Sequence, residues 1–270
     1  MDHIIDIGVL GAEGRMGAAI IRALDAEPRA HLTVALTIPQ SDNLGEDIGY
    51  VAGLKNCGVE LTSDIRAGLE ACDVLIDFSS PRAAIDAALG MHDTRCHTLI
   101  TGTTGYTETE EAALLAVAEN ITLLKSGNFS LGVNMLEALV EQTALRLREG
   151  WDIEVYEMHH KHKVDAPSGT ALMLGEAAAK GRGVKLQDHQ ILSREGRGDP
   201  RAEGDIGFTA LRGGGVIGQH EVLFASELEM LTLRHEAFDR SVFASGAVVA
   251  ALWAANQDTG LYSMKDVLGF

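Results

Sequence analysis

The sequence is poor in cysteine and in cationic residues, and each shortage argues against a class of protein. Its three cysteines, Cys57, Cys72 and Cys96, are an odd number without a CxxC spacing. We therefore expect free thiols that act as small buried apolar side chains, rather than a disulfide framework. Lys and Arg number 22 against 39 Asp and Glu, for a formal net charge of −17 at pH 7. Binding to nucleic acid or to an anionic membrane needs a basic face, so we expect neither partner.

Long apolar runs and targeting signals are lacking as well. No apolar stretch approaches the roughly 20 residues that span a bilayer. The N-terminal "MDHIIDIGVLG" has neither a basic region nor a small-residue cleavage site, and its pattern predicts a strand rather than a signal peptide. With free thiols and an acidic surface, we expect a cytoplasmic protein. The 270 residues, 46% of them hydrophobic, suffice for two hydrophobic cores.

A strand, a glycine-rich loop and a helix follow one another at the start of the chain. Residues 4–10 are mostly apolar and β-branched, which is typical of a strand buried on both faces. The loop "GAEGRMG" has a G-x-x-G-x-x-G spacing, and an apolar stripe predicts a helix from Met16 up to Pro28. Glycines let the backbone approach phosphates, and the helix N-terminus offers unpaired N–H groups. This order predicts a nucleotide-binding platform rather than an ordinary tight turn.

One element of such platforms is absent. Folds that bind NAD usually carry an acid at the end of the second strand, where it holds the ribose hydroxyls. The predicted second strand, residues 31–38, ends in Thr37 and Ile38. Arg15, inside the glycine loop, could reach a 2′-phosphate or cover the adenine. The sequence therefore leaves the choice between NADH and NADPH open.

Further strand-like segments continue the pattern of a parallel sheet. They lie at 72–80, 97–105 and 121–130, with helical segments near 81–90 and 107–120. Each strand ends in small or polar residues, and ligands of an open parallel sheet bind beyond the carboxyl ends of its strands. We therefore expect three segments to line one crevice: Phe78–Ser80, Gly102–Thr104 and Ser126–Phe129.

The second half of the chain has a different pattern. A long helix is predicted over 131–148 and a long polar loop over 182–205, and the strand candidates lie at 152–158, 206–212, 216–225 and 228–235. Residues 210–226, with three consecutive glycines, are typical of a hairpin. The fold class is therefore α/β, an N-terminal Rossmann-type parallel sheet with a second α+β domain built on a mixed or antiparallel sheet. We expect a dinucleotide-binding domain at 1–130, with 241–270 packing back on it, and a substrate-binding and oligomerisation domain at 131–240.

The stretch His159–Lys163 is a run of His and Lys in an acidic protein. If the strand before it continued, His159, Lys161 and Lys163 would share one side and His160 and His162 the other.

The residues after this run, Ser168-Gly169-Thr170 behind Pro167, suit a helix start. There Ser168 or Thr170 can cap the helix, and the free N–H groups can donate hydrogen bonds to an anion. A carboxylate substrate fits this arrangement. A His can deliver its proton, and a neighbouring cation helps to lower the pKa of that His.

Metal binding and a solvated surface are the competing interpretations of this run. Three histidines within four residues could bind a metal. However, no Cys and no HxxxH pattern supports a metal site, and the nearby lysines would repel a cation. We therefore predict no metal and favour anion binding with proton transfer.

At these residues the sequence resembles the 4-hydroxy-tetrahydrodipicolinate reductase (dihydrodipicolinate reductase) family. The resemblance covers nearly the whole chain, because "GAEGRMG", "GTTGY", "NFSLGVN" and "HHKHKVDAPSGTA" stand in the family's order. It implies that the protein reduces a cyclic dicarboxylate with NADH or NADPH in lysine and diaminopimelate biosynthesis, by hydride transfer followed by protonation. It also implies a homotetramer assembled through the sheet of the second domain.

The resemblance implies site residues as well. The family's catalytic His and Lys match His159 and Lys163, without deciding which of them gives the proton. His160, Gly169 and Thr170 match substrate-binding positions, and we add Ser168 from the helix start. The cofactor-binding positions are matched by Gly11, Ala12, Glu13, Gly14, Arg15, Met16, Gly102, Thr103, Thr104, Ser126, Gly127, Asn128 and Phe129. Many members carry an acid followed by a base where this chain has Thr37 and Ile38, which affects the cofactor preference rather than the activity.

Two other functions compete with the reductase. Another two-domain nicotinamide dehydrogenase acting on a small carboxylate fits the first half equally well, but it leaves "KVDAPSGT" unexplained. A redox-sensing nucleotide-binding regulator would need a DNA-binding or partner module. No basic helix-turn-helix segment is visible, and the net charge opposes that interpretation.

Overall fold

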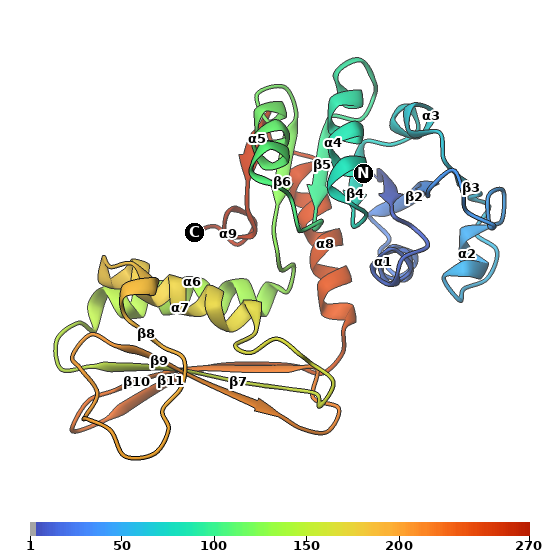
Figure 1. The fold of residues 1–270 in the computed structure, drawn as a ribbon. Helices are drawn as coiled ribbons and strands as arrows, with labels where there is room; N and C mark the ends of the chain where they lie inside the picture. Colours follow the sequence, from blue (N-terminus) through green and yellow to red (C-terminus); the bar gives the residue numbers. More distant parts are fainter. Residues whose placement is uncertain (1–3) are drawn as a thin grey trace. The chain divides into compact units, whose positions relative to one another are not determined.

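A computed structural model describes residues 4–270, and their contacts group them into two compact units (Figure 1). One unit comprises the described residues up to Ser130 together with Ser241–Phe270. The other comprises Leu131–Arg240.

The first unit is built on a parallel sheet of seven strands. The strand order is β12-β6-β5-β4-β1-β2-β3, and every neighbouring pair is parallel. The central strands are almost fully buried, which is typical of parallel sheets covered on both faces. The strands are β1 (Ile5–Leu10), β2 (Ala30–Leu36), β3 (Leu61–Thr62), β4 (Val74–Asp77), β5 (Thr98–Thr101), β6 (Thr122–Lys125) and β12 (Gly260–Tyr262).

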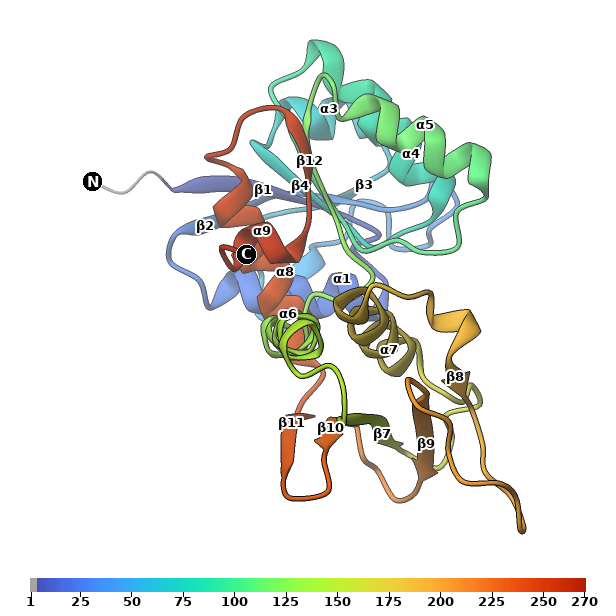
Figure 2. The same cartoon turned by 90° about the vertical axis from the view of Figure 1, so that its left-hand side faces the viewer.

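Helices cover both faces of this sheet (Figure 2). One face carries α1 (Arg15–Asp25) and α8 (Ser241–Ala254). Helix α8 is apolar nearly all round and buries mainly Ala, Gly and Val, so it packs closely against α1 and the central strands. The other face carries α3 (Ile65–Glu70), α4 (Pro81–Gly90) and α5 (Glu108–Val117), and the shorter helices are α2 (Ile48–Val51) and α9 (Met264–Val267).

The second unit is a five-stranded mixed sheet with two helices on one face (Figures 1 and 2). Helices α6 (Leu131–Arg146) and α7 (Gly169–Arg182) pack on each other and on the sheet, and residues such as Val140, Val155 and Phe208 fill the core between them. The strand order is β11-β10-β7-β9-β8, with bounds β7 (Asp152–His159), β8 (Gln190–Ile191), β9 (Ile206–Arg212), β10 (Gly218–Ala225) and β11 (Met230–Ala237).

These two sheets confirm the predicted fold class, but the predicted hairpin over 210–226 is wrong. Strands β9 and β10 do not pair with each other, because β7 lies between them, parallel to β9 and antiparallel to β10. The glycine segment crosses the end of β7, where the Gly213 N–H donates to the carbonyl of His159 at 2.9 Å. The hairpin of this sheet is β10–β11.

The three cysteines are free thiols, as predicted. Cys72 and Cys96 are buried, but the expectation of burial is wrong for Cys57, which is exposed. Among residues 4–270, no helix is long and apolar enough to cross a membrane. The same residues contain no group of three or more His, Cys, Asp or Glu placed to hold a metal ion.

Candidate functional site

The glycine loop between β1 and α1 leaves no room for side chains. Gly11 has φ +79°, and a Cβ there would lie 2.7 Å from the carbonyl oxygen of Phe78. A Cβ at Gly17 would lie 2.3 Å from the carbonyl oxygen of Gly11. Glycine is therefore required at both positions, one for the left-handed backbone and one for the close approach of helix to loop.

Helix α1 begins directly after this loop, with Gly14 as its N-cap residue. The N–H groups of Gly11 and Ala12 donate to the carbonyl of Leu36 at 3.0 and 3.1 Å, so they tie the loop to β2. The first N–H groups of the helix, from Arg15 onward, have no partner within the helix. These are the main-chain donors that an anion at the loop would meet.

A cleft of about 890 Å³ lies beside the loop, within the first unit. Its wall is made by the loop, by the segment after β2 and by the turn into α4. Representative lining residues are Gly11, Glu13, Thr37, Asn43, Phe78 and Arg82. The volume falls within the usual range for small-molecule sites. The glycine cradle, the helix N-terminus and the cleft together fit the phosphates and one nucleoside of a dinucleotide.

The carboxyl ends of β4, β5 and β6 meet around one aromatic ring. The ring of Phe78 lies against Gly102, where a Cβ would come within 2.2 Å of its Cε1, and its centroid is 5.4 Å from that of Phe129. The Ser79 N–H donates to Oγ1 of Thr103 at 3.0 Å. The three predicted segments are thus brought together, although only Phe78–Ser80 lines the 890 Å³ cleft.

A buried carboxyl group at the end of β4 holds the turns that follow β4 and β5. Asp77, at the end of β4, accepts hydrogen bonds from Oγ1 of Thr101 at 2.7 Å and from the N–H of Ser79 at 3.0 Å, and the Ser79 hydroxyl is its third partner. Burial raises the pKa of Asp77, and these hydrogen bonds oppose the shift. Asp77 therefore holds the strand-end turns together, a role that the sequence analysis missed.

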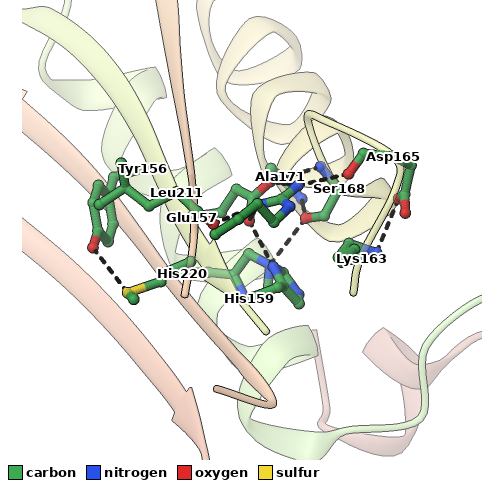
Figure 3. A network of polar contacts seen from close by, with 11 residues as sticks. Tyr156, Glu157, His159, Lys163, Asp165, Ser168, Ala171, Leu211 and His220 are labelled. Carbon is green, nitrogen blue, oxygen red and sulfur yellow. Dashed lines mark hydrogen bonds and ion pairs between the residues drawn. The ribbon is translucent and has the colours of Figure 1, made fainter. Parts of the chain in front are cut away.

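In the second unit, strand β7 presents an acid and a histidine on the same buried face (Figure 3). Oε2 of Glu157 lies 2.6 Å from Nδ1 of His159. Arg212, opposite His159 on β9, donates to both oxygens of Glu157 at 2.8 Å. The N–H of Ser168 donates to Oε1 at 3.1 Å. One buried carboxylate therefore connects the histidine, the arginine and the start of α7.

These contacts set the protonation of the pair. Burial raises the pKa of Glu157, but hydrogen bonds from Arg212 and His159 outweigh it, so the pKa is lowered and the group is a carboxylate. Burial lowers the pKa of His159, Glu157 opposes this, and Lys163 and Arg212 add to it. The lowered pKa confirms the predicted direction, although burial contributes more than the neighbouring lysine.

The other ring nitrogen of His159 is left for a ligand, because Glu157 occupies Nδ1. A Cβ at Gly218 on β10 would lie 3.1 Å from Nε2. A side chain at this position would therefore crowd Nε2, and glycine avoids that contact.

A second buried histidine stands beside His159. The rings of His220 and His159 meet edge to face, with centroids 5.0 Å apart. Burial lowers the pKa of His220 to about 4, so it is neutral at physiological pH. Its Nε2 lies 3.2 Å from Oγ of Ser168, and that oxygen accepts from the N–H of Ala171 at 3.1 Å. Ser168 is therefore the predicted N-cap of α7, and its role as a substrate ligand stays a prediction.

The chain turns immediately after β7, so the strand does not continue through residue 163 and the alternation expected for an extended chain does not arise. The N–H of Lys163 donates to the carbonyl of His160 at 3.1 Å, which closes a turn. Nζ of Lys163 then lies 2.9 Å from Oδ2 of Asp165, and the lysine is close enough to His159 to lower its pKa (Figure 3). The turn brings Lys163 back toward His159, whereas an extended strand would carry it about four residues farther along the sheet.

The remaining predicted substrate residues lie on the same turn and on the first turn of α7. Nδ1 of His160 is buried without a hydrogen-bond partner in the described chain, and its Nε2 is 3.3 Å from Nη2 of Arg240. Gly169 is the first residue of α7, and the space where its Cβ would lie is open. Thr170 follows on the same turn. The predicted substrate residues thus lie at the N-terminus of α7 and on the turn that precedes it.

Two profiles of one protein family together match nearly the whole chain. The profile "Dihydrodipicolinate reductase, N-terminus" matches residues 5–129, and "Dihydrodipicolinate reductase, C-terminus" matches residues 132–268. The chain belongs to the dihydrodipicolinate reductase family. The resemblance recognised in the sequence is thereby confirmed.

Curated relatives of this family member carry the name 4-hydroxy-tetrahydrodipicolinate reductase. The protein from Rhodopseudomonas palustris (strain BisB18) is 51% identical over 262 residues, covering 97% of this chain and 96% of the relative. The one from Rhizobium rhizogenes is 50% identical over 269 residues, covering 99% and 98%. A solved structure of dipicolinate-bound dihydrodipicolinate reductase from Paenisporosarcina sp. TG-14 shares the fold, with a TM-score of 0.76, 21% identity and coverage of 96% and 97%.

Three polar residues of the second unit were missed by sequence reasoning. Glu157 stands two residues before His159, and strand alternation could have placed both on one face. Arg212 and His220 carry no local signal, because they reach the site only through the pairing of β9 and β10 with β7.

Proposed function

We propose that this protein is a reductase that converts 4-hydroxy-tetrahydrodipicolinate to tetrahydrodipicolinate with NADH or NADPH, in lysine and diaminopimelate biosynthesis. The reaction adds a hydride and a proton to the substrate and releases water. The observation that carries the proposal is the buried Glu157–His159 pair beside Lys163 and the start of α7. It occurs in a chain that is about half identical to curated reductases of that name.

The first unit is the part that we expect to hold the cofactor. Gly11, Gly14 and the N–H groups at the start of α1 suit a pyrophosphate, and the cleft beside β2 suits the adenosine. When bound, the cofactor supplies the hydride. The segments Gly102–Thr104 and Ser126–Phe129 adjoin Phe78 at the strand ends, which supports their predicted role in the same cofactor site.

The second unit is the part that we expect to hold the substrate. A dicarboxylate must bind to a protein whose formal net charge is −17, so positive charge has to be local. Lys163 and the N-terminus of α7 provide it close together in the chain, and His160 adds a ring nitrogen to the same segment. The structural neighbour from Paenisporosarcina was solved with dipicolinate, which is itself a dicarboxylate.

We assign the proton of the reaction to Nε2 of His159. Glu157 fixes Nδ1, so the ring holds Nε2 in a single orientation, and Gly218 places no side chain against that nitrogen. Lys163 lies next to the histidine and pairs with the exposed Asp165, which a substrate carboxylate can replace; we expect Lys163 to bind that carboxylate and to stabilise negative charge on the substrate. The carboxylate of Glu157 stabilises the protonated imidazole before transfer.

The test is oxidation of NADH and of NADPH, followed at the nicotinamide absorbance, with freshly generated substrate. We expect oxidation only when substrate is present, with product accumulating in step. Folded protein that binds nucleotide but oxidises neither cofactor with this substrate would contradict the proposal. It would favour a different carboxylate substrate.

The predicted homotetramer and cytoplasmic location belong to the same proposal. The face of the second sheet opposite α6 and α7 carries Tyr156, Met158, Leu211 and Met230, of which Leu211 and Met230 are clearly exposed. The same face carries charged side chains such as Arg234 and Glu236, and a mixture of exposed apolar and charged groups suits a subunit contact. Light scattering should give four times the chain mass, and Met230→Glu should lower it. A monomer would contradict the assembly.

A further inference from the structure

An acidic side chain stands at the end of β2, although the sequence there contains none. Glu13 extends from the glycine loop and meets the segment that follows the strand. Its Oε1 accepts a hydrogen bond from Nδ2 of Asn43 at 2.6 Å, and its Oε2 accepts one from the hydroxyl of Thr37. All three residues line the 890 Å³ cleft. The loop therefore delivers a carboxylate to the place where nucleotide-binding folds usually carry an acid on the second strand.

The state of this carboxylate suits a ribose. The hydrogen bond from Thr37 lowers the pKa of Glu13, burial opposes it, and Asn43 and Ser41 add to the lowering. The group is therefore ionised at neutral pH. An ionised carboxylate has about four acceptor positions. Thr37 and Asn43 use two of them and Ser41 also interacts with the group, which leaves at least one acceptor position for a ribose hydroxyl.

The charge around the cleft disfavours a phosphate at the same place. Glu13, Asp42 and Asp86 line it together with a single arginine, Arg82. The guanidinium of Arg82 is 2.9 Å from Oδ2 of Asp86, on the next turn of α4, so its charge is already paired. Arg15 is exposed at the start of α1 and does not line the cleft. A 2′-phosphate would therefore meet a net negative wall.

We propose that Glu13 binds the adenosine ribose and selects cofactors without a 2′-phosphate, so that NADH is preferred to NADPH. Thr37, the residue found where the usual acid is missing, orients the replacement carboxylate instead. This inference rests on the proposed function, since it names the residue that chooses between the two cofactors.

Calorimetric binding of ADP-ribose and of 2′-phospho-ADP-ribose tests the inference without any catalysis, because neither compound carries nicotinamide. The wild type should bind ADP-ribose at least about ten-fold more tightly than the phosphorylated compound. Glu13→Gln should weaken ADP-ribose binding by about ten-fold and should bring the two affinities within a few-fold of each other. Thr37→Val keeps the carboxylate but removes the hydroxyl that orients it, and it should lower the ratio partway.

Glu46→Gln is the matched control. It makes the same change at an exposed acid of the segment after β2 that does not line the cleft, and it leaves the Glu13–Thr37 contact intact, so the ratio should stay within a few-fold of the wild type. A Glu13→Gln variant that keeps the wild-type ratio of affinities would overturn this inference and leave the proposed function standing. Tighter wild-type binding of the phosphorylated compound would do the same. Failure of the wild type to bind either compound would overturn the proposed function as well.

Discussion

Replacing Glu157 by Gln should lower the pKa of His159 by about one to two units and leave the shape of the site in place. Gln has the same length and can still accept a hydrogen bond from Nδ1, so the ring orientation persists. What disappears is the negative charge 2.6 Å from the imidazole. A hydrogen bond to a charged group contributes about 1.5–3 kcal/mol net, and one pKa unit corresponds to about 1.36 kcal/mol.

The direction of the change in kcat follows because protonated His159 is the proton donor. Imidazolium is populated below the pKa of His159, so a lower pKa moves the loss of kcat on the alkaline side to lower pH by the same one to two units. At neutral pH the rate should fall by about ten-fold or more. The assay is a histidine NMR titration of both proteins together with the pH dependence of kcat.

Glu154→Gln is the matched control for this change, because it removes the same charge from the same strand. Glu154 pairs with Arg194 and Arg201 and makes no contact with His159. That variant should leave the titration of His159 unchanged. Arg212 loses its carboxylate partner in Glu157→Gln but keeps the carbonyl of Asp165 at 2.6 Å, so the variant should fold with reduced stability. An unchanged His159 titration in folded Glu157→Gln would refute the reasoning.

Three further predictions concern the same region. Lys163→Ala should reduce kcat/KM by about a hundred-fold or more in steady-state assays. Lys161→Ala removes an exposed lysine of the same turn and should have little effect. Equal effects of the two substitutions would remove Lys163 from the site. His159→Ala should lower kcat by about a hundred-fold and leave the Kd for NADH within a few-fold of wild type. His162 is exposed, and His162→Ala should change neither quantity. Weaker NADH binding with an unchanged kcat would place His159 in the nucleotide site. Because burial holds the pKa of His220 near 4, the unfolded chain binds a proton between about pH 6.5 and 4 that the folded chain does not. The free energy of unfolding should therefore fall by about 3 kcal/mol from this group as the pH drops through that window, and urea titrations should show that loss missing in His220→Asn; identical pH dependence of the two proteins would contradict it.

The parallel sheet could be predicted because its signals are local. The apolar strands, the glycine loop and the helices between strands each lie within one short segment, and a parallel arrangement follows from their alternation. The hairpin error has the opposite origin. Strands β9 and β10 run in opposite directions whether or not they are neighbours, and a glycine-rich connection between them looks the same in both cases. Only the insertion of β7 distinguishes the two, and that is a property of the folded sheet.

The sequence by itself identified which residues of the second unit carry the chemistry of the site. The segment from His159 to Thr170 contains the histidine, the lysine and the helix start, because they are close along the chain and their chemistry is visible in the letters.

Only the tertiary structure decided how these groups are charged and held. Arg212 reaches Glu157 across 55 positions of sequence, His220 reaches Ser168 across 52, and Thr37 reaches Glu13 across 24. Such contacts depend on strand register and on burial. Because burial and ion pairing set a pKa, the protonation of the site is decided by the fold rather than by any local motif.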